Sequence, residues 1–137
     1  MAQVLDASVA VAWCAPSQAT ALTKAVLHKV IADGALVPPS FWYEVFHGLS
    51  QLRRRGIVAQ AEIDAFIENL SELDFSVDPA RDVAEMIELY RLSQRTQLSI
   101  YDAGYLELAF RSGLPLATGD KALALAARNA GAAIFSI

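Results

Sequence analysis

Four of the fifteen acidic residues in this chain directly adjoin apolar segments, whereas the others fall mostly on the polar faces of predicted helices. The four are Asp6, Glu44, Asp102 and Asp120. If they converge without a counter-charge they repel one another, and some hold protons at neutral pH. A hard divalent cation removes this difficulty, and all-oxygen ligation suits Mg²⁺ or Mn²⁺. The chemistry that such a site supports is phosphodiester hydrolysis, in which metal ions activate a water and stabilise charge on the attacking and leaving oxygens.

Asp102 lies in the segment 98–109, LSIYDAGYLELA, which predicts the first turns of a helix capped by Ser99. An apolar stripe at spacings of three, four and seven from Asp102 is formed by Tyr105, Leu106 and Ala109. Asp102 is therefore expected at the end of the buried face, near the positive pole of the helix dipole, where an unpaired charge is costly. Glu107 is expected well round toward the opposite side of the helix, where it can be solvated.

Short apolar segments alternate with amphipathic ones along the whole chain. Strands are predicted at residues 4–5, 35–37, 75–77, 116–118 and 133–135. Helices are predicted at residues 7–13, 18–33, 40–55, 60–73, 78–96, 99–112 and 121–130. This alternation predicts an α/β domain in three layers, with a short, mostly parallel central sheet of about five strands between helices on both faces. The length of 137 residues predicts one domain over 1–137.

The predicted topology brings the acidic residues toward one edge of the sheet. Asp6 directly follows the first strand, and Asp120 follows the fourth. In parallel sheets the ligand crevice lies beyond the carboxyl ends of the strands. Glu44 and Asp102 lie in early turns of helices that can enter the same edge.

Each of these residues also has a simpler interpretation. The aspartates Asp6, Asp102 and Asp120 are all placed to cap helices, and Glu44 can be a solvated residue beside an apolar stripe. His47 follows Glu44 by one helical turn, and we interpret it as a structural or surface residue. The hydroxyls of Ser8 and Thr118 stand beside two of the acids, as supporting groups for them or as turn formers.

Composition narrows the class of protein. Hydrophobic residues make up 55% and charged residues 19%, which indicates that some apolar surface is covered by a subunit or partner. A net charge of −4 argues against broad adhesion to nucleic acid, though not against a local basic patch. Cys14, the single cysteine, fits a reducing compartment and a core position. We find neither a membrane-spanning pattern nor a signal peptide, so we expect a cytoplasmic protein.

Four motifs, in order along the chain, resemble a known family. They are DAS after the first strand, EV at Glu44, SIYDAGYLELA around Asp102, and TGD-KAL around Asp120. Together they resemble the PIN-domain ribonucleases, and more narrowly the VapC-type toxins of bacterial toxin–antitoxin pairs. The resemblance implies a PIN-like fold and an endoribonuclease that uses Mg²⁺ (or Mn²⁺) at the four acidic residues. It also implies a homodimer, an RNA substrate and a small antitoxin whose C-terminal segment blocks the active-site groove.

One basic run and one departure from the family pattern bear on this interpretation. The run at 53–55 is Arg53, Arg54 and Arg55, either a solvated helix end or a contact for the RNA backbone. Lys121, beside Asp120, has the same two interpretations. VapC-like sequences often carry asparagine at the position of His47, and if His47 reaches the site it can contact a metal or a phosphate.

The sequence argues against two other classes of α/β domain and leaves a third open. A receiver-like phosphoacceptor needs paired acids after the first strand and a late lysine, and a haloacid-dehalogenase-type phosphatase needs D-x-D there. The sequence has a single acid, Asp6, followed by Ala7 and Ser8. A catalytically inactive PIN-like domain that only binds a partner stays open as the alternative.

Overall fold

The computed structural model describes residues 3–135, which form an α/β domain around a small parallel sheet. Its strands are β1 (Val4–Leu5), β2 (Ala35–Val37), β3 (Phe75–Val77) and β4 (Leu116–Ala117), in the order β3-β2-β1-β4. All three pairings are parallel. Because β1 and β4 are fully buried, they are apolar runs rather than alternating ones.

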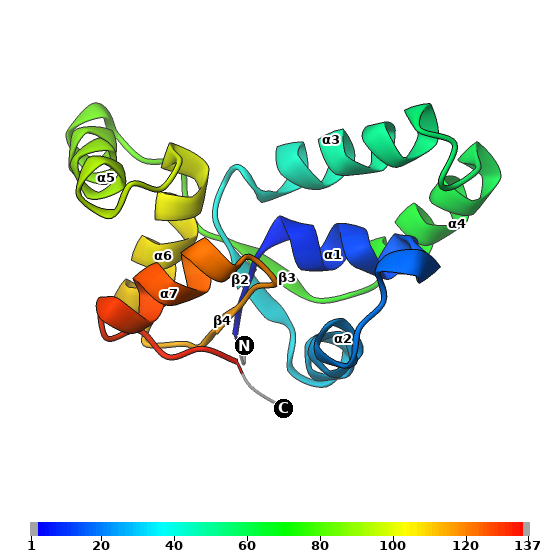
Figure 1. The fold of residues 1–137 in the computed structure, drawn as a ribbon, viewed down its shortest axis with the longest axis horizontal. Coiled ribbons are helices and arrows are strands. Elements are labelled where there is room, and N and C mark those ends of the chain that lie inside the picture. Colours follow the sequence, from blue (N-terminus) through cyan, green and yellow to red (C-terminus); the bar gives the residue numbers. More distant parts are fainter. Residues whose placement is uncertain (1–2, 136–137) are drawn as a thin grey trace.

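Seven α-helices are described over the same residues, together with a 3₁₀ turn at Pro16–Gln18. They are α1 (Ala7–Cys14), α2 (Ala21–Asp33), α3 (Phe41–Arg54), α4 (Gln60–Ser71), α5 (Val83–Thr96), α6 (Ile100–Ser112) and α7 (Lys121–Asn129). Figure 1 shows them in two groups, with α1 to α4 on one side of the short sheet and α5 to α7 on the other. The predicted three-layer α/β/α architecture is therefore confirmed.

Three details of the prediction were wrong. The sheet has four strands rather than about five, because the segment at 133–135 makes a single parallel bridge, between Ile134 and Leu116. The helix expected from Asp78 begins at Val83, since Asp82 is its cap and exchanges hydrogen bonds with Glu85. The helix expected from residue 18 begins at Ala21, after a reciprocal cap between Thr20 and Thr23.

The order of the strands creates a crevice at one end of the sheet. The chain proceeds from β1 outward to β2 and β3, then returns to place β4 on the other side of β1. The direction of winding therefore reverses between β1 and β4, and ligands bind at such switch points in open α/β sheets. Asp6 and Asp120 leave the sheet at this place.

Close packing of α1 against α3 brings a second wall to the crevice. Gly48 of α3 lies directly over Val11, where an added Cβ would be 2.7 Å from the valine Cγ2. A larger residue at this position would force the Val11 side chain or one of the helices to shift. The first turn of α3, which holds Glu44, is thereby held beside the start of α1.

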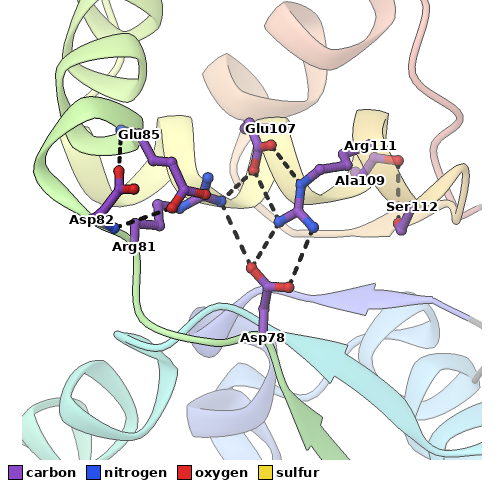
Figure 2. Close-up of polar contacts among 8 residues, drawn as sticks. All are labelled: Asp78, Arg81, Asp82, Glu85, Glu107, Ala109, Arg111 and Ser112. Atoms are coloured by element: carbon purple, nitrogen blue, oxygen red, sulfur yellow. Dashed lines mark hydrogen bonds and ion pairs between the residues drawn. The ribbon is translucent and has the colours of Figure 1, made fainter.

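The position of α6 is fixed from outside by a cluster of four charged residues, Asp78, Arg81, Glu107 and Arg111 (Figure 2). Arg81, whose side chain is 9% exposed, donates to Glu107. Arg111 lies 2.7 Å from both Asp78 and Glu107. We call these residues the ion-pair cluster. It ties the β3–α5 connection to α6, the helix that carries Asp102.

Glu107 lies on a side of α6 that the sequence allows to be solvated, but in the structure it is partly buried. Its side chain is only 26% exposed, because Arg81 reaches it from a segment 26 residues away. Burial by itself would raise the pKa of Glu107, but the hydrogen bonds from Arg111 and Arg81 outweigh burial and hold that pKa below its usual value.

We expect Glu107→Gln to lower the free energy of unfolding by about 1–3 kcal/mol, because Arg81 is left nearly buried without its carboxylate. Since the folded-state pKa of Glu107 is lowered, this contribution is present above the ordinary glutamate pKa of about 4.3 and is lost as pH falls through the folded value. Urea unfolding at neutral and acidic pH measures both effects. The control is Asp33→Asn, which removes an exposed ion pair to Lys29 and should change little. Equal effects of the two substitutions would contradict the assignment.

Candidate active site

A cleft of about 840 Å³ opens at the carboxyl end of the sheet, and all four acidic residues line it. They are Asp6 after β1, Glu44 in the first turn of α3, Asp102 in the first turn of α6, and Asp120 before α7. The structure thus brings together side chains that are separated by more than a hundred residues in the sequence. The cleft is also lined by Ser8, Gln18, Tyr43, His47 and Tyr101, among others.

Asp6 is held in place by three hydrogen bonds. Its side chain is 4% exposed and accepts from the backbone N–H of Ser8 at 3.3 Å. The Ser8 hydroxyl donates to Asp6 Oδ2 at 2.8 Å, and the buried Thr118 hydroxyl donates to the same oxygen at 2.7 Å. Asp6 is therefore both the cap of α1 and part of the cleft wall, so the two interpretations of its sequence position do not compete.

Glu44 is oriented by Ser40 and by a buried phenol. The Ser40 hydroxyl donates to Glu44 Oε1 at 2.9 Å, and the hydroxyl of Tyr105 donates to the same oxygen at 3.2 Å. Tyr105 is fully buried and also accepts from the backbone N–H of Ala7 at 3.3 Å. Burial, followed by the nearby charges of Glu44 and Asp6, raises the pKa of Tyr105 well above its ordinary value, so the phenol stays a donor.

Sequence reasoning placed Tyr105 on the core-facing stripe but missed its hydroxyl. The available signal was that a buried tyrosine normally finds a hydrogen-bond partner for its O–H group. That partner is Glu44, on a helix 61 residues earlier.

Asp102 and Asp120 stand at the starts of two further helices. The Ser99 hydroxyl accepts from the backbone N–H of Asp102 at 3.1 Å and caps α6. Asp120 Oδ1 accepts from the backbone N–H of Leu123 at 3.0 Å and caps α7. The N-termini of α1, α6 and α7 therefore face the cleft, and their dipoles partly offset its negative charge.

Burial and neighbouring carboxylates disfavour the ionised forms of Asp102 and Glu44. The pKa of Asp102 is raised, first by burial and then by repulsion from Asp6 and Asp120. The pKa of Glu44 is also raised, mainly by burial, with repulsion from Asp6 and Asp102 adding to it and hydrogen bonds from Ser40 and Tyr105 opposing it. A cation in the cleft would relieve this repulsion, and carboxylate oxygens are the donors that Mg²⁺ and Mn²⁺ prefer.

The carboxylates of the cleft lie farther apart than the ligands of a single metal ion do. Among residues 3–135, no three His, Cys, Asp or Glu side chains lie close enough together to hold one metal ion in this conformation. The residues therefore suit a divalent cation in type and charge, while their gathering around one ion requires side-chain movement.

Of the other residues that the sequence suggested for the site, some line the cleft and others lie outside it. His47 lines the cleft one turn along α3 from Glu44. Arg53, Arg54 and Arg55 are exposed or nearly so at the other end of α3, roughly 15 Å along its axis from Glu44. Lys121 is exposed at the start of α7. Neither the arginines nor Lys121 are among the described residues that line the cleft. Two exposed cleft residues, Tyr43 and Tyr101, had no role in the sequence interpretation.

Comparisons with known proteins agree on one family. The PIN domain profile matches residues 4–129, a range that contains all four acidic residues. Ribonuclease VapC3 of Mycobacterium tuberculosis, in strains CDC 1551 / Oshkosh and ATCC 25618 / H37Rv, is 32% identical over 102 residues, covering 74% of this chain and 72% of the relative. The crystal structure of PAE2754 from Pyrobaculum aerophilum aligns with a TM-score of 0.70 and 26% identity, covering 92% of this chain and 86% of that one.

We expect Asp102→Asn to leave the metal-free protein at least as stable as the wild type near pH 7, because it removes a carboxylate whose ionised form is disfavoured. Since the folded-state pKa of Asp102 is raised, the penalty is complete above that pKa and disappears as pH falls toward the ordinary aspartate pKa of about 3.9. Unfolding in EDTA at the two pH values measures it. Asp64→Asn, on exposed surface of α4, is the matched control and should change little. A clear loss of stability in Asp102→Asn at neutral pH, absent in the control, would contradict this account.

Proposed function

The chain belongs to the PIN-domain family and, within it, to the VapC-type ribonucleases, and we propose that it is a divalent-metal-dependent endoribonuclease that acts as the toxin of a toxin–antitoxin pair. The observation that carries the proposal is the convergence of Asp6, Glu44, Asp102 and Asp120 on one cleft. A second candidate, an inactive domain that only binds a partner, keeps the fold and would use the cleft acids to bind basic groups of that partner; the cleavage assay below separates the two.

We assign the cleft acids to a Mg²⁺ or Mn²⁺ site. A bound cation of this kind supplies charge stabilisation for the phosphodiester and lowers the pKa of a bound water. Asp6, Glu44, Asp102 and Asp120 would hold it, and their own surroundings decide how well. Ser8 and Thr118 keep one oxygen of Asp6 fixed, and Ser40 and Tyr105 do the same for Glu44. Asp102 and Asp120 lack a comparable pair of hydroxyl donors among the described residues, so both have more freedom to move toward a cation than Asp6 and Glu44.

RNA must approach a strongly acidic cleft, and repulsion from the phosphates opposes this approach. The cation offsets part of that repulsion. We propose that Arg53, Arg54, Arg55 and Lys121, which are positioned outside the cleft, contact the RNA backbone at a distance from the reacting bond.

The same acidic cleft suits a protein inhibitor with a basic C-terminal segment. An arginine of such an antitoxin forms paired, charge-assisted hydrogen bonds with carboxylates, and it would compete with the cation for Glu44 and Asp102.

Of the described helices, none is long and apolar enough to cross a membrane.

We propose a homodimer that pairs through α5. The helix exposes an apolar stripe at spacings of three, four and seven, formed by Val83 (77% exposed), Met86 (40%), Ile87 (45%) and Tyr90 (56%). Figure 1 shows α5 at one extremity of the molecule. Its first half carries Glu85 and Glu88, and its second half carries Arg91 and Arg95. Antiparallel pairing of two copies about a two-fold axis buries the stripe and sets each acidic half against a basic half.

We expect the purified, partner-free protein to cleave RNA internally when Mg²⁺ or Mn²⁺ is present, because the cleft acids then have their counter-charge. EDTA should abolish cleavage, and Asp102→Asn should lower the rate by at least about a hundredfold. Gel analysis of a mixture of structured and unstructured RNAs measures this, with Asp64→Asn as the control. Cleavage that survives EDTA would sink the metal mechanism. Absence of cleavage in metal-loaded protein would favour the inactive alternative.

We expect light scattering at micromolar concentration to give the mass of a dimer, and Ile87→Glu to convert it to a monomer, because the charge would be buried at the centre of the pairing. The control is Ile31→Glu on α2, which is also exposed (61%) but lies outside the stripe. A monomeric wild type, or a dimer that tolerates Ile87→Glu as well as Ile31→Glu, would contradict the assignment.

A further inference from the structure

Two tyrosines stand at the cleft with most of their surface in solvent. Tyr43 on α3 is 83% exposed, and Tyr101 on α6 is 57% exposed. Both line the cleft, and each directly precedes one of the acids, Glu44 or Asp102. The two rings therefore come from different helices but line the same cleft as the four carboxylates.

Neither ring is used by the fold. The described aromatic contacts all involve Phe41, Trp42, Phe46 and Phe75, which form a separate group. Of the described hydrogen bonds, none involves the hydroxyl of Tyr43 or Tyr101. By contrast, Tyr105 on the same helix as Tyr101 is buried and bonded twice. The faces of Tyr43 and Tyr101 are thus free to contact a ligand.

The charge of the cleft determines which part of a nucleic acid can use these rings. The described lining includes four carboxylates and neither lysine nor arginine, so it attracts phosphate poorly without a cation. Stacking of a base on an aromatic face does not depend on charge of either sign, and it tolerates any base. It does require a base that is not already stacked in a duplex.

We propose that Tyr43 and Tyr101 are stacking platforms for two unpaired nucleobases of single-stranded RNA at the acidic cleft. The inference rests on the proposed ribonuclease function and adds two residues that hold the bases of its substrate. Each ring would hold a base at the cleft that the carboxylates line. Because any base can stack on an aromatic ring, the two tyrosines would select for unpaired RNA rather than for a particular base.

The test compares two oligonucleotides of equal length, a single-stranded RNA and the same ribose-phosphate backbone without bases. Binding is measured in the Asp102→Asn background with Mg²⁺, so that bound RNA is not consumed. We expect Tyr43→Ala and Tyr101→Ala each to weaken binding of the RNA by about tenfold, and Tyr→Phe at either position to retain it. The base-free backbone should bind weakly and should not distinguish the alanine variants from their parent. Phe110→Ala, which removes an exposed ring of α6 outside the cleft lining, is the control and should have no effect.

Equal binding of the RNA by the parent and both alanine variants would overturn the proposal, and would leave the two rings as a surface for a protein partner. A loss of affinity for the base-free backbone as large as for the RNA would overturn it too. The proposed ribonuclease function is tested separately, by measuring RNA cleavage by the wild-type protein. Base-dependent binding without cleavage supports the platforms and removes the nuclease assignment, and cleavage with base-independent binding does the reverse. Failure of the protein to bind or cleave RNA overturns both.

Discussion

Burial of carboxylates in one cleft, together with the repulsion among them, is the constraint on which the rest of this structure depends. Burial and mutual repulsion raise the pKa of both Glu44 and Asp102. The fold offsets this cost by directing the N-termini of three helices at the cleft and by supplying hydroxyl donors to Asp6 and Glu44. What remains unbalanced is negative charge in a pocket large enough for a cation and a phosphate, which is why a metal-dependent reaction on a phosphodiester is the function that we propose.

Several residues serve the fold and the cleft at the same time. Asp6 caps α1 while lining the cleft, and Tyr105 fills the core while holding Glu44. Tyr105 links α6, α3 and the first turn of α1 through two hydrogen bonds. The ion-pair cluster fixes α6 from the opposite side, through the β3–α5 connection (Figure 2). The positions of the acids are therefore set by the same contacts that stabilise the domain.

Local signals in the sequence predicted the four strands of the sheet and most helices, because these elements depend on short apolar runs, caps and helical periodicity. They failed where a distant residue decides the outcome. Asp78 looks like a helix cap, but Arg111 engages its carboxylate and the helix begins later, at Val83. Glu107 looks solvated until Arg81 folds back onto it. At the cleft, the predicted parallel strands were enough to bring Asp6 near Asp120. The position of Glu44 could not be predicted in this way, because it depends on the packing of Gly48 against Val11.

Diffraction from crystals grown with Mn²⁺ tests the central claim most directly, because anomalous scattering locates the ion independently of activity. The account predicts a peak in the cleft with oxygens of at least two of Asp6, Glu44, Asp102 and Asp120 within about 2.0–2.3 Å. It also predicts that Asp102 has moved toward the ion, since it has fewer fixed partners than Asp6 or Glu44. A cleft without a peak at saturating Mn²⁺, or a peak bound only by residues outside the cleft, would contradict the account.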